Sequence, residues 1–247
     1  MHTFTNIATA SLLISAAGLA AFAPEGPTTS PAAPATTSPA PAPAQPAASK
    51  AAKPAGPGPV IASTGVVESA KKMGDTAPDF SLPDAQGGTF VLKDALAKGP
   101  VVLTWFRGEW CPFCNKQLIG MQERMKDFEA AGATVVAISP QTMDHTQATA
   151  TKDNVKFHML SDEGFKVGEM YGVKYEMPEA MKEQLKKYNL DLSKYNGGEG
   201  NALPLTATYV IDQQGTITYA FLDPDYTKRA SPDALLAAVN EIKARKK

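Results

Sequence analysis

The sequence has almost no net charge, few histidines and very few cysteines. Its 247 residues carry 24 Lys and Arg against 25 Asp and Glu, with three His and two Cys, for a formal net charge of −1. No long basic block is interleaved with aromatic residues, so neither a nucleic-acid surface nor a strongly acidic partner is predicted. No internal repeat is present either. The evidence for fold and function therefore comes from short motifs and from differences in composition along the chain.

The N-terminal part of the chain has few charged and aromatic residues. Up to about residue 59 it is mostly Ala, Pro, Ser and Thr. Proline fixes φ and removes donors, and so little apolar bulk cannot offset the entropy lost when a chain is ordered. We therefore expect residues 24–73 to be a disordered, extended tether. Residues 74–247 are expected to form one domain, which is long enough to bury a core.

Residues 1–23 contain an apolar run, 7–22, with the length of a signal-peptide core, which is short for a membrane span. Small residues near its end suit a cleavage site, although no Lys or Arg precedes the run and Pro24 disfavours cleavage after Ala23. No cysteine follows the run, which excludes lipidation there. We expect a cleaved signal or a membrane anchor, with the domain exported to the periplasm or tethered outside the cytoplasm.

From residue 74 onward, apolar patterns predict an α/β domain with a mixed sheet. A hairpin is predicted over 76–92, and the apolar run 101–106 predicts a central strand covered on both faces. Apolar residues three and four apart predict one helix over 116–132, ended by Gly132. The other predicted elements are a strand at 133–139, a helix at 142–152, a strand near 157–160, a helix ending near 172, a helix at 178–188, a hairpin at 206–221 and a final helix from 231.

The only two cysteines, Cys111 and Cys114, lie in the stretch WFRGEWCPFCNK, residues 105–116. A structural zinc site needs two further ligands, but only His145 and His158 lie in the domain, and their spacing is not that of a zinc finger. A disulfide across so short a loop would remove little entropy from the unfolded chain. Two inert thiols are a further alternative. We expect no metal and no other cofactor.

The position of the pair favours redox chemistry. It follows a predicted buried strand and begins a predicted helix, where first-turn N–H groups and the helix dipole stabilise a thiolate. Such sites lower a thiol pKa from about 8.5 to as little as roughly 3.5–7.5, and the thiolate is the reactive species. Pro112 suits a first helical turn. The two-residue spacing lets one sulfur attack the other, so oxidation can end in a disulfide.

The strand, the Cys-x-x-Cys motif and the helix are similar to the thioredoxin superfamily. Residues 74–247 more closely resemble its peroxiredoxins, the alkyl hydroperoxide reductase/thiol-specific antioxidant family, in their CxxC-bearing branch. The resemblance implies a thioredoxin-like fold, with a mixed central sheet flanked by helices and an N-terminal β-hairpin, and reduction of hydrogen peroxide or organic hydroperoxides. The segments that carry it are GDTAPDFSLPD (74–84), the site stretch (105–116), VVAISPQT (135–142), LSDEGFKVGEMYGV (160–173) and TYVIDQQGTI (208–217).

The two family templates assign the cysteines differently. Peroxiredoxins carry Pro-x-x-x-Thr-x-x-Cys, and reading back from Cys114 places Arg107 at the Pro and Cys111 at the Thr. Thioredoxins instead make Cys111 the nucleophile and Cys114 its resolving partner. We expect Cys111 to attack, because the first cysteine of such a motif is normally the more exposed. The arginine that peroxiredoxins place just before the strand at 206–211 is replaced by Thr206.

Several neighbours are candidate supporting residues. Arg107 is expected either to stabilise a thiolate or a departing oxyanion, or to be a solvated loop arginine. Glu109 could shuttle a proton or lie on the surface, and Trp110 could shield the site or offer a platform to a partner. Thr104 contributes only if its hydroxyl faces the cysteines. His145, near a predicted helix start, is a further candidate.

Three functions are consistent with these features. The first is a thiol-dependent peroxidase that reduces a hydroperoxide through Cys111 and Cys114 and is recycled by a thioredoxin-like dithiol reductant. The second is a thiol–disulfide oxidoreductase acting on protein disulfides, which the missing Thr and Arg favour. The third is a redox-regulated adaptor whose charged segment 174–202 binds a partner. The resemblance along the whole domain favours the peroxidase.

Overall fold

The computed structural model describes residues 64–245. The signal or anchor predicted over 1–23 and most of the predicted tether lie outside the described residues. Helix α1 (Thr64–Ser69) falls within the predicted tether, yet Val66 is buried against the domain. The domain begins earlier than composition suggested, because Val66 and Val67 give this stretch apolar side chains to bury. Within the described part, no helix combines the length and apolar character that a membrane span requires.

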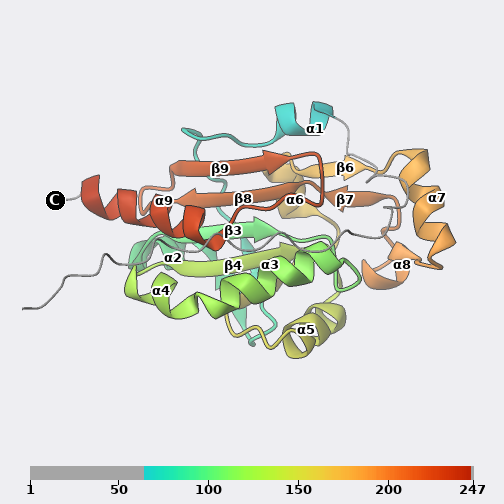
Figure 1. Ribbon diagram of the computed structural model, residues 1–247, viewed down its shortest axis with the longest axis horizontal. Helices are drawn as coiled ribbons and strands as arrows, with labels where there is room; N and C mark the ends of the chain where they lie inside the picture. Colours follow the sequence, from blue (N-terminus) through green and yellow to red (C-terminus); the bar gives the residue numbers. More distant parts are fainter. Residues whose placement is uncertain (1–63, 246–247) are drawn as a thin grey trace, which may run out of the picture. The chain divides into compact units, whose positions relative to one another are not determined.

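A five-stranded mixed sheet forms the centre of the domain, in the order β5-β4-β3-β8-β9 (Figure 1). Strands β3, β4 and β5 run parallel, whereas β8 is antiparallel to β3 and β9 is antiparallel to β8. This confirms the predicted mixed sheet. The strands are β3 (Val101–Trp105), β4 (Thr134–Ser139), β5 (His158–Ser161), β8 (Thr206–Ile211) and β9 (Ile217–Asp223).

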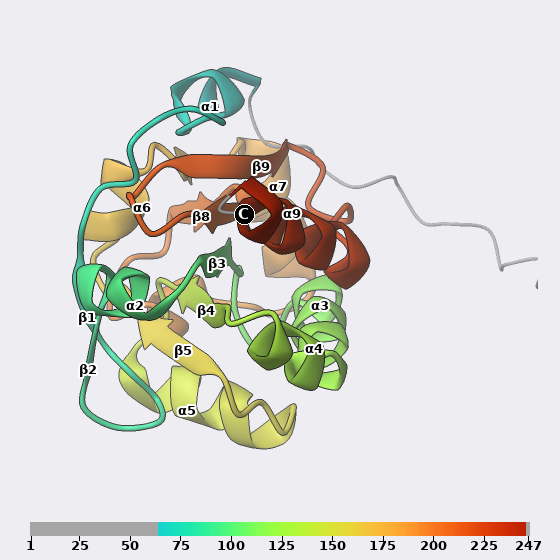
Figure 2. The same ribbon diagram turned by 90° about the vertical axis from the view of Figure 1, so that its left-hand side faces the viewer.

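Helices cover both faces of this sheet. All of β3 is buried, and its alternate side chains enter different layers, Val102 on one face and Leu103 on the other. Helices α2 and α6 lie on the Leu103 face, and α3, α4 and α9 on the Val102 face (Figure 2). The helices are α2 (Leu92–Lys98), α3 (Pro112–Glu123), α4 (Met125–Ala130), α5 (Met143–Lys152), α6 (Lys166–Met170) and α9 (Pro232–Arg245).

The predicted N-terminal hairpin is present as β1 (Ser81–Pro83) and β2 (Thr89–Val91), with Leu82 opposite Phe90. Both of these apolar side chains are buried. The hairpin therefore packs its apolar face on the domain and leaves its other face exposed, as the alternation of a half-buried strand requires.

The single helix predicted over 116–132 was wrong. Arg124, between α3 and α4, has φ −102° and ψ 11°, outside the helical region, and its side chain pairs with Asp233 at the start of α9. The apolar spacing continues across this break, since Phe128 is fully buried as expected. Periodicity alone could not reveal the break, because both short helices present their apolar side to the same layer.

The charged segment 174–202 forms an insertion at the end of the domain toward which β3 and β4 run (Figure 1). The helix predicted over 178–188 is confirmed as α7, and Met181 buries it against the domain. Strands β6 and β7, which pair antiparallel, and helix α8 were not predicted. The elements are β6 (Lys174–Glu176), α7 (Glu179–Lys187), α8 (Leu192–Tyr195) and β7 (Ala202–Pro204).

Candidate active site around the cysteine pair

The cysteine pair lies where β3 passes into α3, as predicted. The Phe106 N–H still donates to the Ile138 carbonyl at 2.9 Å, so the sheet fixes the chain to this point. Cys111 is the N-cap residue of α3, with an extended backbone (φ −93°, ψ 106°), and Pro112 begins the helix. Cys114 lies in the first turn, where the helix N-terminus favours a negative charge.

The loop before the pair is held on several sides. Gly108 has φ +151°, and a Cβ there would come within 2.5 Å of Gln141 Oε1, so this position requires glycine. The Glu109 N–H donates to the same Gln141 oxygen. The Glu109 carbonyl accepts hydrogen bonds from Asn115 Nδ2 and Lys152 Nζ, each at 2.9 Å. These contacts orient the backbone that leads into the helix.

The two sulfurs are close together and equally hidden. Cys111 Sγ and Cys114 Sγ are 2.7 Å apart, and both cysteines are free thiols. Their exposed fractions are 1% for Cys111 and 0% for Cys114. Cys111 lines a surface cavity together with Arg107 and residues of the 174–202 segment, whereas Cys114 does not line it. Both thiols are buried, and only Cys111 borders the cavity.

Arg229 is a site residue that sequence reasoning missed. Its Nη2 lies 3.1 Å from Cys114 Sγ, and its Nη1 donates to Thr206 Oγ1 at 3.1 Å. Thr206 occupies the place at which peroxiredoxins are expected to carry an arginine, so a guanidinium reaches the sulfur from another part of the chain. Arg229 lies 115 residues from Cys114, in the loop between β9 and α9. No local motif marks it.

The environment places the negative charge of the pair on Cys114. Burial raises the pKa of Cys114, but the hydrogen bond with Cys111, the charge of Arg229 and the Arg107 N–H at 3.4 Å outweigh burial and lower it to about 5. The hydrogen bond to Cys114, followed by burial, raises the pKa of the Cys111 thiol. The directions of the two shifts therefore favour a thiolate on Cys114, with Cys111 as the neighbouring thiol.

Arg107 is part of the site and not a solvated loop residue. It is only 4% exposed, and its guanidinium carbon lies 4.1 Å from the centre of the Tyr226 ring and 5.0 Å from that of Trp110. Its Nη2 contacts Met181 Sδ at 3.6 Å. Its charge lowers the pKa of both cysteines. Trp110 thus packs beside the pair and contributes to the wall that shields it.

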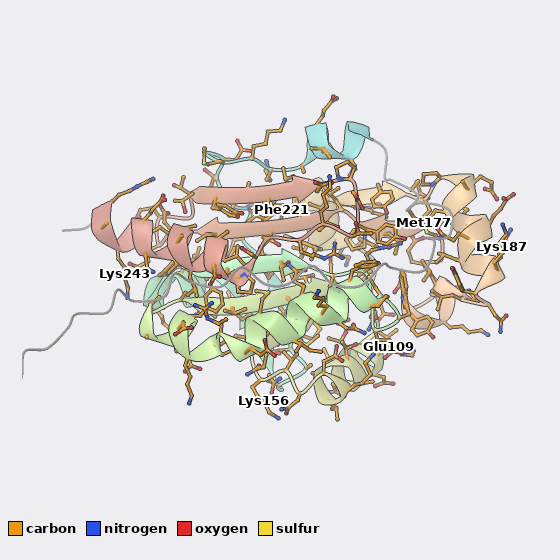
Figure 3. All side chains as sticks on the ribbon, in the orientation of Figure 1. Glu109, Lys156, Met177, Lys187, Phe221 and Lys243 are labelled. Atoms are coloured by element: carbon orange, nitrogen blue, oxygen red, sulfur yellow. The ribbon has the colours of Figure 1, made fainter. Side chains whose placement is uncertain are left out.

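The other two candidates brace the surroundings of the pair. The Glu109 carboxylate lies 3.2 Å from His145 Nδ1, at the end of the domain that also carries α7 (Figure 3). The Thr104 hydroxyl lies 2.8 Å from Thr208 Oγ1 and accepts a hydrogen bond from Gln117 Nε2 at 3.3 Å. Each of these side chains thus has a hydrogen-bond partner other than the two sulfurs.

The surroundings of the cysteine pair are cationic. Within residues 64–245, no three His, Cys, Asp or Glu side chains gather closely enough to hold a metal ion. The pair has arginines around it instead of ligands, and cations disfavour a metal ion and favour an anion. The arrangement is suited to a thiolate and to the oxyanions that form when a thiolate cleaves an oxygen–oxygen bond.

A buried strand that leads into Cys-x-x-Cys at a helix N-terminus, within this sheet order, defines a thioredoxin-fold thiol protein. The chain belongs to the AhpC/TSA family, whose pattern matches residues 73–220. This confirms the family that the sequence motifs resembled.

Known relatives lie among the peroxiredoxins. The chain is 31% identical over 160 residues to "Peroxiredoxin Q, chloroplastic" of Triticum aestivum, covering 65% of this chain and 63% of that protein. It is 37% identical over 103 residues to "Peroxiredoxin Bcp" of Escherichia coli K12, covering 41% of this chain and 65% of that protein. The match thus spans less than two thirds of each of these relatives. The crystal structure of "Peroxidoxin BcpB" from Mycobacterium tuberculosis is similar with a TM-score of 0.54 and 26% identity, covering 70% of this chain and 97% of that one.

Proposed function

We propose that this protein is a thiol peroxidase in which Cys114 attacks a hydroperoxide and Cys111 resolves the product. The observation that carries the proposal is the surroundings of Cys114 Sγ, with Cys111 Sγ at 2.7 Å and Arg229 Nη2 at 3.1 Å. Membership of the AhpC/TSA family and the peroxiredoxin relatives support the choice of substrate. The order of attack reverses the order expected from sequence, because the charge is stabilised on Cys114.

In the proposed reaction the two cysteines supply both electrons that reduce the peroxide. The Cys114 thiolate attacks the terminal oxygen of R–O–O–H, an S–O bond forms, the O–O bond breaks, and RO⁻ leaves behind a Cys114 sulfenic acid. RO⁻ takes the proton of the Cys111 thiol and becomes ROH. The Cys111 thiolate then displaces hydroxide from the Cys114 sulfur, and hydroxide takes a proton from solvent to become water. Two electrons pass from the dithiol to the peroxide, and a disulfide remains.

Closing the disulfide requires little movement. The sulfurs are already 2.7 Å apart, and a disulfide bond is about 2.05 Å long. The first turn of α3 therefore need not unwind between attack and resolution. A thioredoxin-like dithiol protein would restore the pair by attacking one sulfur, forming a mixed disulfide and then releasing the reduced enzyme. Cys111 is the proposed point of attack, since its residue lies in the wall of a surface cavity.

Rapid mixing of the reduced protein with hydrogen peroxide or cumene hydroperoxide tests the activity. Trp110 lies beside the pair, so its fluorescence should report oxidation. We expect a second-order rate constant at least about a hundredfold above that of free cysteine, since the pKa and the arginines favour the attacking thiolate. A rate no faster than free cysteine, together with efficient reduction of a protein disulfide, would instead assign the protein to the thiol–disulfide oxidoreductases.

We further propose that the domain works outside the cytoplasm, on the strength of the apolar run at 7–22. Expression of the full chain with a C-terminal epitope, followed by fractionation, is expected to place it in an exported fraction. A chain lacking residues 1–23 is the matched control and should remain in the cytosol. Recovery of both chains in the cytosolic fraction would contradict export.

A further inference from the structure

Two arginines lie beside the cysteine pair, and neither has a carboxylate partner in the described part of the chain. Within residues 64–245, no ion pair includes Arg107 or Arg229. A carboxylate next to a guanidinium would offset much of its field at the sulfur, because opposite charges at similar distances nearly cancel. Neutral groups leave that field intact. The groups that hold the two arginines therefore decide how much positive charge acts on Cys114.

Arg107 is held by two aromatic faces and a thioether. Its guanidinium carbon lies 4.1 Å from the centre of the Tyr226 ring and 5.0 Å from that of Trp110, both within the range of a cation–π interaction. Its Nη2 lies 3.6 Å from Met181 Sδ, a weak acceptor. Arg107 is only 4% exposed, and a cation–π interaction is stronger when the cation is removed from water. Tyr226, the nearer ring, is therefore its main neutral partner.

Arg229 is held by main-chain oxygens and one hydroxyl. Its Nη1 donates to the carbonyls of Tyr226 and Lys228 and to Thr206 Oγ1. Its Nη2 lies 3.1 Å from Cys114 Sγ. Because the acceptors all bind one nitrogen, the other nitrogen is directed at the sulfur. Tyr226 thus contacts both arginines, one with its ring and the other with its carbonyl.

The loop that carries Tyr226 is fixed by its own side chains. Asp225 Oδ1 accepts hydrogen bonds from the N–H and the hydroxyl of Thr227, at 3.0 and 2.7 Å. Asp223 Oδ1 accepts one from the Asp225 N–H at 2.8 Å. Such turns favour one conformation of a short loop. The Tyr226 ring also contacts the Phe113 ring in a T-shaped arrangement, with centres 5.8 Å apart, which anchors the loop to the first turn of α3.

We propose that Tyr226 is a positioning residue that directs the charges of both arginines at the cysteine pair through neutral contacts. This inference rests on the proposed function, in which the Cys114 thiolate attacks the peroxide. A substitution can change the ring, which contacts only Arg107 of the two arginines. The carbonyl that binds Arg229 is present in every variant. Removing the ring should therefore weaken one charge and leave the other in place.

The test measures the pH midpoint at which the Cys114 thiolate forms, by its ultraviolet absorbance. The full chain carries Cys111→Ser, so that one thiol remains. Tyr226→Leu should raise this midpoint by about half a unit to one unit of pH, the size expected for a lost cation–π contact. The reason is that a leucine side chain cannot hold the Arg107 guanidinium near the sulfur.

Three controls separate the ring from the loop. Tyr226→Phe keeps the aromatic face and should leave the midpoint in place. Tyr188→Leu removes a different ring from the cavity that Cys111 lines, and it should also have no effect, since Tyr188 is 74% exposed and makes neither cation–π contact with Arg107. In an Arg107→Met protein, Tyr226→Leu should cause no further shift, because the ring acts through that guanidinium.

Each outcome decides the inference. It fails if Tyr226→Leu leaves the midpoint unchanged, or if the shift persists in the Arg107→Met protein, since the ring would then only support the loop. If thermal melting shows that Tyr226→Leu does not fold, Tyr226→Met carries the same expectation.

Rapid mixing with hydrogen peroxide distinguishes this failure from that of the peroxidase function. With Cys111 restored, Tyr226→Leu should slow the reaction by about threefold to tenfold, and Tyr226→Phe should not. A fast reaction with unmoved midpoints leaves the peroxidase standing and overturns the role of Tyr226. The expected midpoints in a protein that reacts no faster than free cysteine would overturn the peroxidase and leave the positioning of the arginines standing.

Discussion

Replacing Cys114 by serine is expected to abolish the fast reaction with hydroperoxide, whereas the Cys111→Ser protein is expected to react once and stop as a sulfenic acid. The reason is that Arg229 and the Arg107 N–H place the charge on Cys114. Without Cys114 no activated thiolate remains, and the rate should fall on the order of a thousandfold. Without Cys111 the attack can occur, but no thiol is present to close the disulfide.

The measurement is rapid mixing with peroxide, followed by trapping of sulfenic acid and mass spectrometry of the two variants. The Cys111→Ser protein should carry one trapped group, on Cys114, and should over-oxidise when peroxide is in excess. The unchanged protein is the control and should end as an intramolecular disulfide. Sulfenic acid on Cys111 in the Cys114→Ser protein, formed at the unchanged rate, would restore the order of attack that the sequence suggested.

The Arg229→Met protein lacks the positive charge beside Cys114. At neutral pH it is expected to react with peroxide about a hundredfold to a thousandfold more slowly than the unchanged protein. Arg229 contacts the sulfur directly, and loss of one such electrostatic partner has effects of this order. The pKa of Cys114 is about 5 in the unchanged protein. Its thiolate is present above that pH and is lost as the pH falls through about 5. Without the guanidinium, this midpoint moves to higher pH.

The measurement is the pH dependence of the second-order rate constant, which a purely structural role of Arg229 would not shift. Arg229→Lys should recover part of the rate, since an ammonium restores the charge but does not reproduce the fork that spans Cys114 and Thr206. Lys228→Met removes a neighbouring positive charge whose ammonium lies 3.5 Å from Asp223, and it should leave the midpoint in place. If the midpoint is unchanged in the Arg229→Met protein, Arg229 does not stabilise the Cys114 thiolate.

Local sequence patterns could not show where the helix after the cysteines breaks or what contacts Cys114, and the reason is the same in both cases. The helix expected over 116–132 is two helices, because Arg124 leaves the helical region while pairing with Asp233 of a helix far along the chain. The preference for Cys111 rested on its position in the motif, which carries no information on Arg229, the cation that contacts Cys114 from 115 residues away. In both cases the deciding contact comes from another part of the chain.

The sequence by itself determined the framework of the fold and the place of the cysteine pair within it. Short-range patterns sufficed for the buried strand at 101–106, the Cys-x-x-Cys pair, the amphipathic stretch after it and the hairpin at 206–221. Strand and helix periods are local properties, and a helix N-terminus favours a thiolate wherever it occurs. The same local motifs indicated the AhpC/TSA family.

Only the tertiary structure decided which sulfur carries the charge and what surrounds it. Arg229 reaches Cys114 across 115 residues of sequence, and α7 and the residues after it line a cavity together with Cys111. Neither contact leaves a local pattern, because a guanidinium lowers a thiol pKa through its distance in space and not through its position in the chain.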